Sequence, residues 1–168
     1  MKKLFIMLIG FASSMSAFSQ GKDVVDIAIG SADHTTLVAA VKAADLVTTL
    51  KGKGPFTVFA PTNAAFDKLP EGTVANLLKP ENKAQLSKIL TYHVVSGNLD
   101  AAAVMTAIKS GNGKAVLTTV SGGKLTASLD MGKVKLTDET GKSAYVTATD
   151  LKGSNGMVHV IDGVVLPK

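Results

Sequence analysis

The hydrophobic residues of this chain change their spacing near residue 110, and this change limits the folds open to it. Before that point most apolar segments have the three- and four-residue spacing of helices, as in Leu37, Val41 and Ala44. After it, residues 114–167 form short segments that alternate polar and apolar positions, separated by turns such as the serine-glycine-glycine run at 121–123. Helices followed by strands predict an α+β fold with a largely antiparallel sheet.

The first nineteen residues have the pattern of a cleaved secretory signal peptide. Met1-Lys2-Lys3 is positively charged, residues 4–12 are apolar, and the segment ends in the small-residue pattern Ala17-Phe18-Ser19. The apolar run is much shorter than the roughly 20 residues that span a bilayer. The sequence therefore predicts a signal peptide over residues 1–19, cleavage before Gln20, and a protein that is secreted, periplasmic or at the cell surface. The alternative is a retained N-terminal anchor.

The remaining residues, 20–168, have the length of one domain, and they contain neither a cysteine nor a further apolar run long enough to span a membrane. A chain of this length buries enough surface to fold without disulfides or a structural metal. All 18 basic residues are lysines, and they are scattered along the chain. Because arginine is the usual reader of guanine edges and the usual bidentate clamp on phosphate, this composition argues against nucleic-acid binding.

Patterns that would indicate catalysis or metal binding are weak. The histidines lack neighbours at the spacing of zinc ligands, and the chain has no G-x-S-x-G segment. Asp150, Asp162 and the Tyr92-His93 pair have groups that transfer protons, but no nucleophile or activating residue accompanies them in the sequence. We therefore expect no catalytic residues, no metal and no cofactor.

The most specific segment is residues 54–66, GPFTVFAPTNAAF. It predicts a short strand with Val58 and Phe59 on opposite faces. The strand ends at Pro61, which has no N–H to donate to a neighbouring strand. The Thr62-Asn63 pair that follows supplies side-chain oxygens able to cap the first turn of a helix. This segment therefore has a structural role that requires no ligand.

Three segments, in order, resemble the fasciclin domain family. Residues 57–66 are similar to its first signature box, residues 90–94 (LTYHV) to its central tyrosine-histidine motif, and residues 155–162 (NGMVHVID) to its second box. The resemblance covers residues 22–167. It implies a fasciclin-like fold with a helical layer packed on a wedge of two mostly antiparallel β-sheets, an extracellular or envelope location, and an adhesive or ligand-binding role.

The resemblance also implies candidate binding residues. In animal members of the family the tyrosine-histidine motif and an Asp-Ile pair before the second box are implicated in receptor binding. The matching residues here are Tyr92, His93, Asp150 and Leu151, with leucine in place of isoleucine. The apolar residues around Tyr92-His93 predict a buried strand, in which the two side chains would lie on opposite faces. Either the pair packs in the core or it reaches a surface groove; we expect His93 to be structural and Asp150 to be more exposed.

These observations predict a non-enzymatic interaction module that binds an extracellular or envelope protein or a polysaccharide. The alternative is a carrier of a small apolar ligand in a cleft between the helices and the sheet. That alternative requires a cavity of about 300 Å³ or more.

Overall fold

The computed structural model describes residues 21–168, so the predicted signal peptide lies outside the described residues. Seven α-helices and two short 3₁₀ turns are present among these residues: α1 Val24–Ile29, η1 Ala32–His34, α2 Thr35–Ala43, α3 Val47–Leu50, α4 Asn63–Asp67, α5 Thr73–Leu77, η2 Pro80–Asn82, α6 Lys83–Tyr92 and α7 Ala101–Ser110. The strands are β1 Phe56–Pro61, β2 Val94–Ser96, β3 Lys114–Thr118, β4 Lys124–Asp130, β5 Lys133–Thr137, β6 Ser143–Gly153 and β7 Gly156–Ile161.

The strands form a seven-stranded sheet in the order β2-β1-β7-β6-β5-β4-β3. Every neighbouring pair is antiparallel except β1 and β7, which run parallel. The two sheets of the predicted wedge are the two parts of this sheet, continuous through the long strand β6. A bridge between Val95 and Thr119 brings the two ends of the strand order together, so the sheet is nearly closed. The predicted α+β class and its mostly antiparallel sheet are confirmed.

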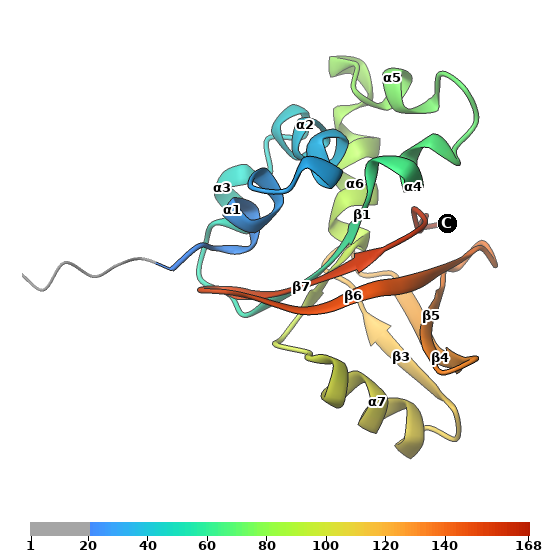
Figure 1. Cartoon of the computed structure of the whole chain (residues 1–168). Helices are drawn as coiled ribbons and strands as arrows, with labels where there is room; N and C mark the ends of the chain where they lie inside the picture. The colour runs from blue at the N-terminus through green and yellow to red at the C-terminus, as the bar shows by residue number, and fades with distance from the viewer. Residues whose placement is uncertain (1–20) are drawn as a thin grey trace, which may run out of the picture.

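Two apolar cores lie on the two sides of β1. Figure 1 shows α1–α6 gathered on one side of β1 and β7, whereas α7 lies beside β3 and β4 at the other end of the molecule. Val58 and Ala60 of β1 pack in the core beneath α1–α6, and Phe59 packs in the core beneath α7. The predicted alternation along this strand is therefore confirmed, and β1 contributes to both cores, as do β2 and β7.

Several helices begin at polar residues that cap them, among them Thr62 of the predicted Thr62-Asn63 pair. Asp23 forms a capping box with Asp26 at the start of α1, Thr62 accepts from the Ala65 amide at the start of α4, and Asp100 accepts from the Ala103 amide at the start of α7. These side chains satisfy amides that the first helical turn leaves without partners.

The expected strand around Tyr92-His93 is wrong. Helix α6 continues through Tyr92, His93 ends it, and β2 begins only at Val94. The physical reason is spacing: buried residues at 86, 89, 90 and 93 recur at intervals of three and four, as on one face of a helix. The side chains of Tyr92 and His93 are consequently placed by a helix end, not by the alternation of a strand.

The last of the segments expected to be strands within residues 114–167, residues 164–166, forms no strand in the described chain, although Val164 and Val165 are buried. Side chains take the place of a neighbouring strand. The Val165 amide donates to His93 Nε2, and the Leu166 amide donates to a carboxylate oxygen of Asp138. The backbone is thus satisfied without a β-ladder.

Candidate functional site

Tyr92 is fully buried in the core beneath α7. Its hydroxyl donates to the Lys124 carbonyl at 2.6 Å and accepts from the Glu139 amide at 3.2 Å. Burial raises the pKa of Tyr92 to about 12. Both hydrogen-bonding functions of the hydroxyl are therefore used inside the fold, and the ring offers no surface to a partner.

His93 is 2% exposed and lies where α6 meets the C-terminal segment. Its Nδ1 atom is 2.8 Å from the Ile89 carbonyl, and its Nε2 atom accepts from the Val165 amide at 3.2 Å. Since a carbonyl only accepts, the proton of the neutral ring is on Nδ1. Burial lowers the pKa of His93 to about 4. His93 is thus a structural residue that joins two segments 72 positions apart.

Asp150 and Leu151 lie on the exposed ribbon formed by β6 and β7. Asp150 has a positive φ of 60° and occupies an irregularity in the register of β6. One of its carboxylate oxygens accepts from the Ala101 amide at 2.8 Å, at the first turn of α7. Leu151 is 38% exposed. Asp150 is therefore exposed, as expected, and it also anchors the start of a helix.

The four candidate residues occupy two separate places. Among residues 21–168 no hydrogen bond or ion pair joins Tyr92 or His93 to Asp150 or Leu151. His93 and Asp150 are connected indirectly, through residues of the core. The His93 carbonyl accepts from the Phe59 amide, and the Phe59 ring stacks on the His159 ring with centroids 5.6 Å apart. The Asp150 amide then donates to His159 Nδ1 at 3.4 Å. Only the second pair is available to a partner.

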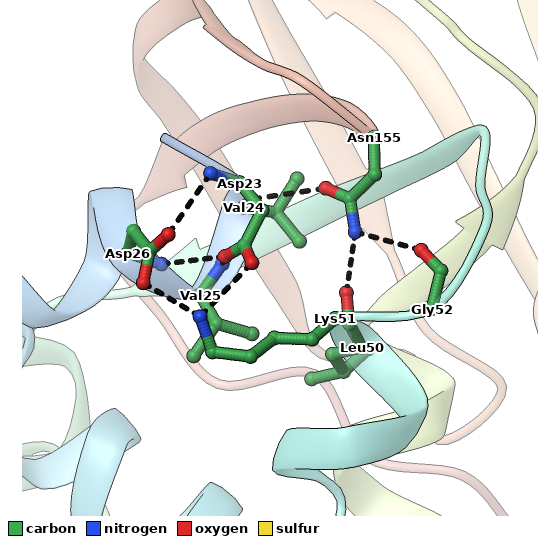
Figure 2. A network of polar contacts seen from close by, with 8 residues as sticks. All are labelled: Asp23, Val24, Val25, Asp26, Leu50, Lys51, Gly52 and Asn155. Atoms are coloured by element: carbon green, nitrogen blue, oxygen red, sulfur yellow. Dashed lines mark hydrogen bonds and ion pairs between the residues drawn. The ribbon is translucent and has the colours of Figure 1, made fainter. Parts of the chain in front are cut away.

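A polar groove of about 1110 Å³ lies where the start of α1, the loop 52–55 and the β6–β7 turn meet. Its polar side chains are Asp23, Asp26, Lys51, Lys53, Asn98, Lys152, Ser154 and Asn155. Lys51 pairs with Asp23 at 2.9 Å and with Asp26 at 2.6 Å (Figure 2). The hydrogen bond to Asp26 raises the pKa of Lys51, and the same bond lowers the pKa of Asp26. Lys53 and Lys152 take part in none of the ion pairs among residues 21–168, so they leave positive charge free in the groove.

Asn155 holds the wall of this groove together. Its side-chain oxygen accepts from the Val24 amide at 3.0 Å, and its nitrogen donates to the carbonyls of Leu50 and Gly52 at 2.7 and 3.0 Å. Figure 2 shows the side chain lying between the start of α1 and the end of α3. Sequence reasoning assigned Asn155 only to a family motif; its place before Gly156, at a turn between two strands, was the available signal of a structural role.

A smaller pocket of about 290 Å³ lies between the same ribbon, α1 and η1. Its apolar lining is Ile27, Ala28, Ala60, Ala148, Leu151, Val158 and Val160, and its polar lining is Ser31, Asp33, His34, Thr62 and Thr147. A third gap, between α1, α2 and α6, holds only about 40 Å³. That gap is far below the size of small-molecule sites, so a carrier function has no room there.

The family-model comparison matches the fasciclin domain over residues 32–167. The chain belongs to the fasciclin domain family. A solved FAS1 domain pair from the insect cell adhesion molecule Fasciclin I has the same fold, with a TM-score of 0.75 and 18% identity. That likeness covers 86% of this chain and 51% of the insect one.

Relatives of this fasciclin domain occur in bacterial and animal proteins. Protein sll1483 of Synechocystis sp. is 49% identical over 92% of this chain and 78% of its own length. The immunogenic protein MPB70 of Mycobacterium bovis is 35% identical over 88% of this chain and 72% of its own length. The transforming growth factor-beta-induced protein ig-h3 of Sus scrofa is 36% identical over 86% of this chain, which spans only 19% of that protein.

The described part of the fasciclin domain, residues 21–168, contains no group of three or more His, Cys, Asp or Glu side chains that could hold a metal ion. Within the same residues no helix is both long enough and apolar enough to cross a membrane. All three histidines are buried, and His93 and His159 are hydrogen-bonded to backbone groups on both ring nitrogens.

Proposed function

We propose that this fasciclin domain is a non-enzymatic interaction module that works outside the cell or in the envelope and binds a protein or polysaccharide surface. The observation that carries the proposal is the polar groove beside the exposed Asp150-Leu151 segment. The groove is open, and Lys53 and Lys152 are exposed in it. A concave polar surface with free positive charge suits a partner that carries carboxylate or other acidic groups.

The buried positions of Tyr92 and His93 support a division of roles. We infer that these two residues maintain the core behind β1, while Asp150 and Leu151 belong to the contact surface. The same burial argues against an enzyme, because the proton-transfer groups of the pair have no access to a substrate. The likeness of the fold to that of the insect cell adhesion molecule Fasciclin I is consistent with an adhesive role. That this chain binds a protein or polysaccharide partner is itself part of the proposal.

The test measures how the purified protein binds an envelope fraction that has been treated in one of two ways. Protease treatment removes protein partners, and periodate oxidation destroys the vicinal diols of polysaccharides. We expect one treatment to abolish binding and to identify the class of partner. Persistent binding after both treatments, or none to the untreated fraction, would contradict the proposal.

Charge-reversed variants connect that binding to the groove. Lys152→Glu changes a groove lysine, and Lys114→Glu is the matched control because Lys114 is also an exposed lysine, on β3 and outside the groove. We expect Lys152→Glu to weaken binding and Lys114→Glu to leave it near the wild-type level. An equal loss of binding in the two variants would mean that binding depends on the net charge of the protein and not on the groove.

A further inference from the structure

We propose that Asn112 is a site of spontaneous covalent modification, at which deamidation converts the side-chain amide to a carboxylate. The sequence contains two Asn-Gly pairs, Asn112-Gly113 and Asn155-Gly156. This dipeptide is especially prone to the reaction, because glycine has no side chain to hinder its backbone nitrogen. The fold exposes the first pair and protects the second. Residues 111–114 lie outside the polar groove, so the proposal does not depend on the interaction function proposed above.

The reaction needs only water and hydroxide. The backbone nitrogen of Gly113 gives up its proton to hydroxide and attacks the side-chain carbonyl carbon of Asn112. The bond from this carbon to the amide nitrogen breaks, and the nitrogen leaves as ammonia with a proton taken from water. Water then opens the resulting five-membered imide ring at either of its carbonyls, which gives aspartate or isoaspartate. The net change is the addition of water and the loss of ammonia, without any electron transfer.

The end of α7 explains why an Asn-Gly pair stands at residues 112 and 113. Gly111 caps the helix, and Asn112 follows it in the left-handed conformation, with φ 54°. Asn and Gly adopt this conformation most readily, and the Gly113 amide closes the helix end by donating to the Ile108 carbonyl at 2.9 Å. Residues 111–114 are exposed, and among residues 21–168 no hydrogen bond holds the Asn112 side chain.

A small opening of the chain is enough to free the attacking nitrogen. The hydrogen bond from the Gly113 amide to the Ile108 carbonyl has to break, which is fraying of the last turn of a helix. Helix ends open at a free-energy cost far below that of global unfolding. The exposed Asn112 side chain is then free to turn toward the Gly113 nitrogen.

Asn155 precedes the same kind of residue in opposite surroundings. Its side-chain oxygen accepts from the Val24 amide, and its nitrogen donates to one carbonyl at the end of α3 and to another in the loop that follows (Figure 2). Gly156 lies so close to β1 that an added Cβ would be 2.0 Å from the Phe56 carbonyl oxygen. Asn155 can react only if these three bonds and this packing open together, which costs much more than the fraying of one helix turn.

The two Asn-Gly pairs serve as each other's control in one protein. The purified protein is aged in mildly alkaline buffer, either folded or unfolded in guanidinium chloride. Cleavage after lysines separates the two pairs, and mass spectrometry follows each peptide. We expect Asn112 to convert roughly tenfold or more faster than Asn155 in the folded protein, and both to convert at similar rates in the unfolded chain. No conversion at Asn112 in the folded protein, or a rate no greater than that of Asn155, would overturn the proposal.

A variant without the Asn112 side chain tests the assignment. Asn112→Gly removes the reactive amide and keeps the left-handed conformation, so it should fold like the wild type. The aged wild type should gain an acidic form in ion-exchange chromatography, because a neutral amide becomes a carboxylate. We expect Asn112→Gly to form acidic species much more slowly. A folded Asn112→Gly protein that becomes acidic as fast as the wild type would contradict the assignment to Asn112.

Discussion

At the scale of single residues, burial separates the four candidate binding positions into two kinds. Tyr92 and His93 direct every polar atom to the backbone of neighbouring segments, whereas Asp150 and Leu151 are exposed. A sequence motif marks positions that a family needs, and those positions include residues needed only for packing. The surface properties of this chain therefore have to be tested apart from its stability.

His93 predicts a loss of stability in acid. Burial lowers its folded pKa to about 4 from the ordinary 6.5, so the unfolded chain takes up the proton first as the pH falls. The contribution is complete above pH 6.5 and disappears as the pH falls from 6.5 to 4, at a cost of about 3 kcal/mol. Urea unfolding of the wild type and of His93→Gln across this range measures it. The free energy of unfolding should fall with decreasing pH less steeply in the variant than in the wild type. The same pH dependence in both proteins would assign the loss of stability to other groups.

Asp150 predicts a graded series of substitutions. Its positive φ favours Asn and Gly, and its carboxylate oxygen accepts from the Ala101 amide. Asp150→Asn keeps both features and should be nearly neutral, whereas Asp150→Ala loses both and should cost about 2 kcal/mol. Asp150→Gly should lie between them. The midpoints of denaturant unfolding compare the stabilities of these variants, provided that the dependence of the unfolding free energy on denaturant is the same in all of them. An Asn variant as unstable as the Ala variant would show that the negative charge of Asp150 stabilises the fold, and not its backbone conformation or its hydrogen bond.

At the scale of elements, the β6–β7 turn is joined to the helical layer by side chains. Asn155 connects the turn to the start of α1 and the end of α3, and Lys51 connects the end of α3 to Asp23 and Asp26 (Figure 2). The Asn155 hydrogen bonds bring together segments more than 100 residues apart in sequence. The polar groove exists because this junction fixes its walls.

Asn155 therefore predicts a stability effect specific to its amide. Asn155→Ala removes three hydrogen bonds and should cost about 2 kcal/mol. Asn155→Asp should cost at least as much at neutral pH, because a carboxylate oxygen would then face two carbonyl oxygens. Ser154→Ala is the neighbouring control, since only the backbone of Ser154 is bonded, to Lys22. Thermal melts compare the three, and a stable Asn155→Asp variant would contradict the assigned orientation of the amide.

The sequence was sufficient to predict elements whose apolar residues recur at a regular spacing or that begin at a clear capping residue. It was insufficient where contacts between distant segments determine the backbone structure. Asp23, Thr62 and Asp100 were identifiable helix starts because their spacing before apolar residues is local information. The backbone at residues 164–166 was not predictable, because its partners are side chains of His93 and Asp138 from distant segments. The irregularity in β6 could not be predicted for the same reason, because the register of β6 is set by its pairing with β7.

At the scale of the whole molecule, one sheet separates two cores and presents one ribbon to the outside. The helices α1–α6 cover one side of β1 and α7 lies on the other (Figure 1). The end of the β6–β7 ribbon is exposed, and its residues line both the polar groove and the smaller pocket. Leu151 lines the pocket and Lys152 lines the groove. The proposed contact surface is thus built on a rigid sheet instead of a loop.

Export is a prediction about the whole chain. The signal-peptide pattern of residues 1–19 predicts a mature protein that begins at or close to Gln20. Mass spectrometry of the protein recovered from its native compartment measures this N-terminus. Recovery of chains that still begin with Met1 would indicate the retained anchor, and the location proposed here would then be at the membrane.

The measurement that tests the account most directly compares two variants in one binding assay against the native envelope fraction. Leu151→Glu places a charge on the exposed ribbon, and Met131→Glu places the same charge on a residue that is 96% exposed at the β4–β5 turn. Both should melt near the wild-type temperature, since both sites are exposed. We predict that Leu151→Glu weakens binding and Met131→Glu does not. A folded Leu151→Glu protein that binds as well as the wild type would show that the ribbon is not the contact surface.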